Sequence, residues 1–411
     1  MNLIKLSWKY LIFRPFSTGL NVILLALGLA IITVLLLMQD QLEKKMNEDA
    51  AGIDLVVGAK GSPLQLILSS VYHIDFPTGN IDLEEARNLG RNRLVKNTIP
   101  LALGDNYQGF RIVGTNLDYL ELYQVDFESG KPWSKAFEVV LGSEVASRLA
   151  LKEGDEFLGS HGISEGSHDH EANYFHVSGV LKSKGNVVDR LILTSIESVW
   201  LTHEESEDSE KVDQSISSEI TLHGLPESDE PKELTTLLVQ YRNPMAAIQL
   251  PRFVNSRTNM QAASPSFEMS RLFELFGVGI SMLKGLAFVL IGISGLGIFI
   301  ALYNSLKDRK YDLAILRAIG ASRIQLVLLI FMEGFILTFL GALIGILIGH
   351  SFLALIISQN QTGVMVSLQP WIFLKAELWV VAYALVVGVL ASVIPALTAY
   401  QTSIAKQLTK A

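Results

Sequence analysis

The chain has 411 residues, with 33 Lys and Arg against 41 Asp and Glu, a formal net charge of −8 and no cysteine. Without cysteine it forms neither disulfides nor thiolate metal sites, and it has no cysteine nucleophile. A hydrophobic content of 49% and a mean hydropathy of +0.36 are too high for an ordinary soluble protein. Because a long polar segment occupies the middle, the composition predicts a membrane protein with one large aqueous domain.

Four apolar stretches are long enough to cross a bilayer as helices, since about 20 apolar residues span its hydrocarbon core. The first is too long for the apolar region of a signal peptide and ends without a small-residue cleavage site, so we expect it to remain as an anchor. The four stretches are 18–38, 285–306, 324–350 and 378–397. The predicted division is an amphipathic cytoplasmic N-terminus (1–16), helix 1 (17–39), an extracytoplasmic domain with stalk ends (40–280), helix 2 (281–306), a cytoplasmic coupling helix (307–323), helix 3 (324–350), a short extracytoplasmic loop (351–376), helix 4 (377–397) and a cytoplasmic tail (398–411).

The distribution of charge predicts the orientation of these helices. Lys and Arg concentrate before the first stretch, between the second and third, and after the fourth, which assigns those segments and both termini to the cytoplasm. Residues 40–280 carry 21 Lys and Arg against 37 Asp and Glu, a net charge of −16, whereas the rest of the chain has +8. We therefore expect 40–280 to lie outside.

The predicted outer domain mixes strands and helices. Short β-branched and aromatic runs closed by Gly or polar residues indicate strands at 110–114, 137–142, 175–181 and 190–194. Helical patterns occupy 64–71, 83–93, 143–149 and 232–241. The expected fold class is therefore four transmembrane helices plus a large mixed α+β domain between helices 1 and 2.

Histidine is concentrated in the outer domain, where 159–173 reads as a polar loop. Imidazole and carboxylate groups there could suit zinc, but they lack a defined ligand spacing, and we favour a solvated loop. The candidate ligands are His161, His168, Asp169, His170 and His176.

Two features of the third apolar stretch concern helix contacts. Glu333 is the only carboxylate inside the four apolar stretches 18–38, 285–306, 324–350 and 378–397, and ionisable groups there are costly and often functional. We favour a structural hydrogen bond over a proton relay, which would require more intramembrane carboxylates. Gly334, Gly341, Gly345 and Gly349 line one helix face and predict the close approach of another helix.

The segment 307–320 is amphipathic. Tyr311, Ile315, Leu316, Ala318 and Ile319 gather on one side, and Arg309, Lys310 and Arg317 on the other. Gly320 then predicts a helix stop and Ser322 an N-cap for the next helix. The segment is either a basic connector that only fixes topology or a docking helix for a cytoplasmic partner.

The run Asp312-Leu313-Ala314-Ile315-Leu316-Arg317-Ala318-Ile319-Gly320-Ala321-Ser322-Arg323 resembles a string of the FtsX, MacB and lipoprotein-releasing LolC/LolE permeases of ABC transporter systems. The glycine strip after Glu333, the segment 394–400 and the order of one span, a large outer domain and three spans resemble that family too. Asp312 stands where the family commonly has Glu.

The resemblance implies a bacterial inner-membrane permease that pairs with a second permease chain and binds cytoplasmic ABC ATPase subunits. The ATPase, which this chain does not contain, would use ATP and move the outer domain through stalks at 40–48 and 270–284, with 50–265 as the working head. The implied coupling residues are Asp312, Leu313, Ile315, Leu316, Arg317 and Gly320.

Three functions stay open at this point. The leading one is a permease subunit for export or extraction of a lipophilic or peptide-like substrate. The first alternative is a non-transport regulator of an extracytoplasmic enzyme, with a periplasmic partner protein; the second is a zinc-linked transport component. We expect no enzyme activity, no directly bound cofactor apart from that possible zinc, and no nucleic-acid partner.

Overall fold

The computed structural model describes residues 3–161, 169–204, 220–359 and 368–401. It divides into two compact units. The helical unit comprises Met1–Glu43 and Glu274–Ala411, and the head unit comprises Lys44–Phe273. Each unit is considered by itself below.

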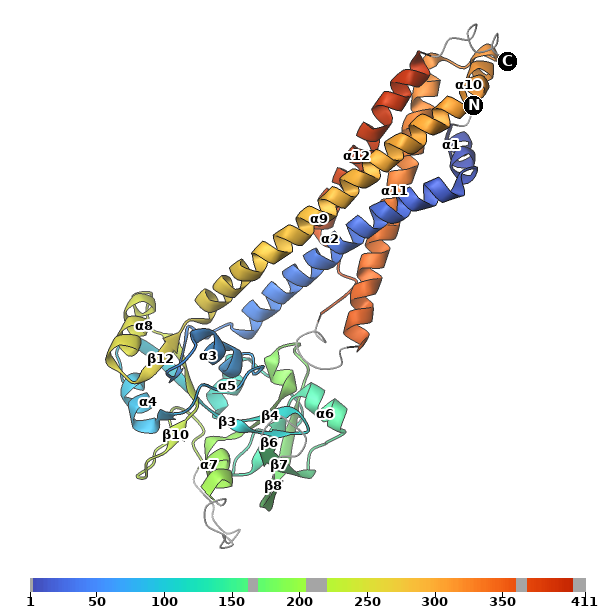
Figure 1. Cartoon of the computed structure of the whole chain (residues 1–411). Helices are drawn as coiled ribbons and strands as arrows, with labels where there is room; N and C mark the ends of the chain where they lie inside the picture. The colour runs from blue at the N-terminus through green and yellow to red at the C-terminus, as the bar shows by residue number, and fades with distance from the viewer. Residues whose placement is uncertain (1–2, 162–168, 205–219, 360–367, 402–411) are drawn as a thin grey trace. The chain divides into compact units, whose positions relative to one another are not determined.

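The helical unit is built from long apolar helices (Figure 1). Its elements are α1 (Leu3–Ile12), α2 (Pro15–Asp49), α9 (Pro265–Asp308), α10 (Lys310–Ala318), α11 (Arg323–Gln359) and α12 (Lys375–Tyr400), with the ends of α2 and α9 reaching into the head unit. Among the described residues, α2, α9, α11 and α12 are the four helices long and apolar enough to cross a membrane. The prediction of four transmembrane helices is confirmed.

Three of these helices, α2, α9 and α11, are longer than a bilayer requires, and α11 has 37 residues. The 44 residues of α9 correspond to about 66 Å at roughly 1.5 Å per residue, twice the hydrocarbon thickness of about 30 Å. The 35 residues of α2 likewise exceed a single span. The segments 40–48 and 270–284, expected to be stalks, are helical continuations of α2 and α9.

Glycines let the helices approach one another closely. A Cβ added at Gly341 would lie 2.6 Å from Leu25 of α2, one at Gly345 would lie 2.7 Å from Leu29, and one at Gly349 would lie 2.8 Å from Thr33. Gly334 faces α12 instead, where it meets Ser392. The strip that the sequence contains is therefore split between two neighbouring helices.

The head unit contains a mixed sheet with helices packed on it and a separate two-stranded sheet formed by its second and tenth strands. Its strands are β1 (Leu55–Ala59), β2 (Ile81–Asp82), β3 (Val95–Tyr107), β4 (Phe110–Thr115), β5 (Phe127–Gly130), β6 (Glu138–Leu141), β7 (Glu156–His161), β8 (Asp169–Leu181), β9 (Leu191–Ser195), β10 (Glu233–Leu234), β11 (Thr236–Tyr241) and β12 (Met260–Ala263). Its helices are α3 (Pro63–Ser70), α4 (Leu83–Gly90), α5 (Leu117–Leu122), α6 (Ser143–Leu149), η1 (Val187–Arg190), α7 (Ile196–Glu204) and α8 (Ala246–Arg257).

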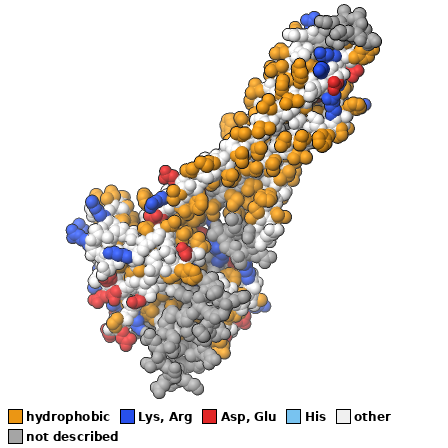
Figure 2. All heavy atoms as spheres, in the orientation of Figure 1, with side chains coloured by type: hydrophobic (Ala, Val, Ile, Leu, Met, Phe, Trp, Pro, Cys, Tyr) orange, Lys and Arg blue, Asp and Glu red, His pale blue; other side chains and the backbone are white. Residues whose placement is uncertain are grey.

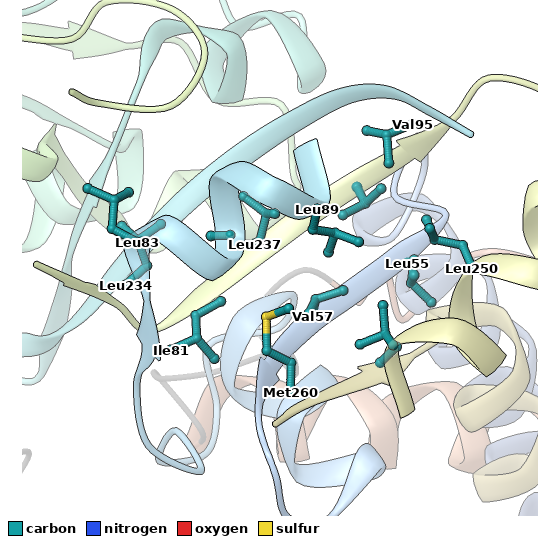
Figure 3. Packing of buried hydrophobic residues seen from close by; sticks show 14 of the residues in the cluster. Leu55, Val57, Ile81, Leu83, Leu89, Val95, Leu234, Leu237, Leu250 and Met260 are labelled. Atoms are coloured by element: carbon teal, nitrogen blue, oxygen red, sulfur yellow. The ribbon is translucent and has the colours of Figure 1, made fainter. Parts of the chain in front are cut away.

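The main sheet runs in the order β12-β1-β11-β3-β4-β9-β6-β8-β5, with β7 against β3 and β8. The pairs β4–β9 and β6–β8 are parallel and the other pairs are antiparallel. One core lies where α4 and α8 cover β1 and β11, as Figure 3 shows. The mixed α+β class of this domain is confirmed.

Two local predictions were wrong. The segment 232–241 forms β10 and β11 rather than a helix, because β11 is a buried central strand between β1 and β3 and its continuous apolar run has no period that separates strand from helix. The loop expected at 159–173 is shorter, since β7 extends to His161 and β8 begins at Asp169.

Candidate coupling site

The short helix α10 connects two long helices at the end of the helical unit where α1 begins and α12 ends (Figure 1). Its exposed side carries an apolar stripe of Tyr311, Ile315 and Ile319, spaced four residues apart, and Ile319 is 80% exposed. Its opposite side, with Leu313 and Ala314, is buried against neighbouring helices. Such a two-sided helix can present one face to a partner while the other holds it in place.

The six predicted coupling residues do not share one environment. Asp312, Ile315 and Gly320 are exposed, and Leu316 and Arg317 are half-buried. Leu313 is 2% exposed and belongs to the core of the helical unit. Its side chain therefore packs on the buried side of α10 and does not lie on the exposed face.

Local sequence explains where α10 and α11 end and begin. Gly320 has φ of +110°, a conformation that favours glycine, and it follows the end of α10. Ser322 and Gln325 then cap α11 reciprocally: the N–H of Gln325 donates to Ser322 Oγ at 3.2 Å, and the N–H of Ser322 donates to Gln325 Oε1 at 2.8 Å. The predicted helix stop and N-cap are confirmed.

A buried ion pair fixes the start of α10. Arg309, the residue just before the helix, donates from Nη1 and Nη2 to the two carboxylate oxygens of Glu333 at 2.9 and 3.1 Å. Its Nε donates to the Ser305 carbonyl at 3.2 Å, and the guanidinium lies 4.0 Å from the ring centroid of Tyr10. Glu333 is 1% exposed, so the bidentate partner offsets the cost of burying its charge.

The N-terminal helix takes part in the same arrangement. Ser7 of α1 donates to the carbonyl of Leu329 in α11 at 3.3 Å, and Arg14, just before α2, pairs with Asp308 at the end of α9. Around Arg309 itself, the Tyr10 ring of α1, the Ser305 carbonyl of α9 and the Glu333 carboxylate of α11 converge. The sequence identifies Glu333 but not its partners, and helical periodicity places Arg309 on the polar side of the coupling helix.

A second polar cluster lies where α11 and α12 are connected. His350 Nε2 is 3.1 Å from Glu377 Oε2, its Nδ1 is 2.5 Å from the Pro370 carbonyl, and its ring stacks on Trp371. The side chain of Gln41 bonds both the N–H and the carbonyl of Gln369. These bonds tie the segment before α12 to α11 and to the continuation of α2; sequence reasoning missed them.

The last turn of α2, which belongs to the head unit, is held by side chains of that unit. Tyr72 donates to the Met46 carbonyl at 3.0 Å and Tyr123 to the Asp49 carbonyl at 2.8 Å. The N–H of Val187 donates to Asp49 Oδ1 at 3.0 Å. Burial, and then the nearby Asp49 carboxylate, raises the pKa of Tyr72, and burial raises the pKa of Tyr123. Both phenols therefore stay protonated. Tyr123 bonds a carbonyl at the helix end, where carbonyls lose their intrahelical partners, and Tyr72 adds a second bond to the Met46 carbonyl, which also accepts the N–H of Ala50.

The metal hypothesis concerns residues that are mostly outside this description. His168 lies outside the described residues, and the side chains of His161, Asp169 and His170 are not described. His176 is exposed, with Nδ1 3.0 Å from Glu156 Oε1. Within the described residues, no group of three or more His, Cys, Asp or Glu could hold a metal ion. Zinc binding stays a prediction.

Two family models match the chain. The MacB-like periplasmic core domain matches residues 18–246, more than half of the chain, and the FtsX-like permease C-terminal model matches residues 284–404. The chain therefore belongs to the FtsX/MacB-type family of ABC permeases, and it is a membrane protein. Permeases of this family work with ABC ATPase partners.

Solved structures of related regions are only distantly similar. The periplasmic region of MacB from Actinobacillus actinomycetemcomitans has 11% identity over 56% of this chain and 97% of that chain, with a TM-score of 0.34. The extracellular domain of the ABC-type transporter YknZ from Gram-positive bacteria has 12% identity over 52% and 99%, with a TM-score of 0.29. At these TM-scores neither likeness carries an argument. No curated protein matches the chain.

Proposed function

We propose that this chain is the permease subunit of an ABC transporter in which a separate ATPase docks on α10 and drives motion of the head unit. The observation that carries the proposal is the apolar stripe of Tyr311, Ile315 and Ile319, exposed on a helix whose start is fixed by the Arg309–Glu333 pair. Asp312 and Gly320 flank the stripe. If a partner bound α10 and moved it, the Arg309–Glu333 pair would transmit that movement to α9 and α11.

The proposal includes a topology. The basic segments that contain α1, α10 and the C-terminal tail face the cytoplasm, where ATP is available, and the acidic head unit lies outside in the periplasm. The lengths of α2 and α9 support transmission of force from the membrane to the head unit. Both helices continue beyond a single span, and the end of α2 is hydrogen-bonded within the head unit. A second permease chain, identical or related, completes the transporter.

The substrate is proposed as a class. Motion of an outer domain on helical stalks suits export or extraction of a lipophilic or peptide-like molecule from the membrane or the periplasm, without a pore inside one chain.

Docking is tested by purifying the chain with its native cytoplasmic partners in mild detergent and assaying ATP hydrolysis. The double variant Ile315→Asp with Ile319→Asp should lose the ATPase, because two charges enter an apolar contact, while the chain still inserts. Ile74→Asp, at an exposed site of the head unit, is the matched control and should keep the ATPase. Retained association in the double variant would refute docking on α10.

Topology is tested separately. The chain has no cysteine, so single variants label cleanly. In intact cells a membrane-impermeant maleimide should label Glu227→Cys in the head unit and spare Lys307→Cys beside α10. The reverse pattern would invert the proposed orientation.

A further inference from the structure

The outer side of α1 is an apolar surface that no described part of the helical unit covers. Ile4 is 62% exposed, Trp8 45% and Ile12 58%. These residues are spaced four apart and lie on one side of the helix. Lys5 and Lys9, each one position further along, form an adjoining exposed basic strip.

The remaining side of α1 faces the protein. Leu3, Leu6, Tyr10 and Leu11 pack into the core formed with α9, α11 and α12, and Ser7 is fully buried against α11. Around the helix, the order is therefore protein contact, apolar strip and basic strip. A helix that lies along a membrane surface beside its own protein requires that sequence of environments.

The apolar strip is continuous with the lipid-facing surface of α2. Phe16, Leu20, Ile23 and Leu27 of that helix are exposed at helical spacing, and the backbone changes direction between α1 and α2, where Pro15 begins the second helix (Figure 1). Side chains of hydrophobic type cover the long helices up to this end of the unit, where Lys and Arg also gather (Figure 2). The strip thus begins where the transmembrane surface ends.

We propose that α1 is a membrane-surface helix whose Ile4, Trp8 and Ile12 insert at the boundary between headgroups and acyl chains while Lys5 and Lys9 contact anionic phospholipid headgroups. Tryptophan favours this boundary because its ring is apolar with one polar N–H, and lysine keeps its ammonium in the headgroup layer. Since Tyr10, on the protein side, lies against Arg309, lipid contact steadies the start of α10. The assignment of α1 to the cytoplasmic leaflet rests on the proposed topology. The proposed contact between α1 and lipid does not depend on that topology.

Spin labelling of the natural cysteine-free chain tests the proposal. Single variants Ile4→Cys, Ile12→Cys and Lys9→Cys are labelled with a nitroxide in vesicles of phosphatidylcholine with phosphatidylglycerol. We expect the labels at Ile4 and Ile12 to be accessible to oxygen and shielded from a water-soluble nickel complex, with an oxygen-to-nickel ratio severalfold above that at Lys9. Depth should be about 5–10 Å into the interface.

Three outcomes would overturn the proposal. Equal nickel access at all three positions would mean that α1 projects into water. Exclusion of both reagents at Ile4 and Ile12 would mean that another protein covers the strip. An unchanged ratio at Ile12 when phosphatidylglycerol is omitted would remove the anionic-lipid part, which requires a shallower position in phosphatidylcholine alone.

The same samples separate this proposal from the proposed function. Lipid exposure of Ile12 is measured without any ATPase, so it stands if α10 proves not to be the docking helix. Impermeant labelling of Lys9→Cys in intact cells reports the leaflet, and labelling from outside would correct the topology while leaving lipid contact in place.

Discussion

The most exacting prediction concerns the Arg309–Glu333 pair. Replacing Glu333 with Gln removes the carboxylate and leaves a guanidinium that is 15% exposed without its charged partner. Breaking one side of a buried ion pair typically costs about 3–5 kcal/mol. Arg309 keeps the Ser305 carbonyl at 3.2 Å and the Tyr10 ring at 4.0 Å, so we expect the lower end, about 3 kcal/mol.

The matched variant removes both charges. Glu333→Met with Arg309→Met keeps apolar volume in the same place, and such replacements are often neutral or stabilising. We expect the double variant to lie within about 1 kcal/mol of the natural protein, which makes the two sites strongly non-additive. Arg309→Lys should resemble Glu333→Gln more than the natural protein, because an ammonium cannot make the planar bidentate contact.

The assay is reversible denaturant unfolding of the full chain in detergent, followed by tryptophan fluorescence, with ATPase coupling as a second readout. The double Met variant should recover stability but not coupling, because the contact between α11 and the start of α10 is lost. A Glu333→Gln protein within about 0.5 kcal/mol of the natural one would refute the reasoning, since surface pairs contribute that little.

Three further predictions use the same unfolding assay. Gly345→Ala should destabilise the chain because its Cβ would lie 2.7 Å from a leucine of α2, whereas Gly292→Ala, with nothing within 4 Å, should be neutral or stabilising by about 0.5–1 kcal/mol; equal effects would contradict the packing. Tyr123→Phe leaves a carbonyl of α2 unpaired and should cost about 1–3 kcal/mol, against almost nothing for the exposed Tyr174→Phe. Burial lowers the pKa of His73 to about 3, below its unfolded value of about 6.5. The unfolded state therefore binds the extra proton, and stability should fall as pH drops below about 6.5, by at most about 1.4 kcal/mol per pH unit. His73→Gln should flatten that part of the pH profile, and an unchanged slope would refute the assignment.

The spans and the separate polar domain could be predicted from the sequence because hydropathy over 20 residues is a strong, local signal. Strand β11 could not. Thr236–Tyr241 is buried between β1 and β3, and its apolar residues are consecutive because both faces of the sheet are covered. Such a run shows neither the period of a strand nor that of a helix, so only long-range pairing with β1 and β3 determines that it forms a strand.

The glycine strip illustrates a different limit. Spacing indicated that Gly341, Gly345 and Gly349 share a face, and they do face α2. Gly334, about two turns before Gly341, faces α12 instead, because α11 contacts different helices along its length. A stripe of small residues shows that some helix comes close, but the identity of that helix depends on the packing of the whole unit.

Helical periodicity alone does not identify Arg309 as the partner of Glu333. Treating 307–320 as one helix put Arg309 on its polar side, whereas the chain breaks at Arg309 and α10 begins at Lys310. A buried intramembrane carboxylate demands a cation or a proton, and a cation can reach it only from a helix end near the membrane boundary. Arg309, at the break between α9 and α10, is the residue that turns toward Glu333. An isolated carboxylate in a span is thus better evidence for the geometry of the adjoining connection than for proton transport.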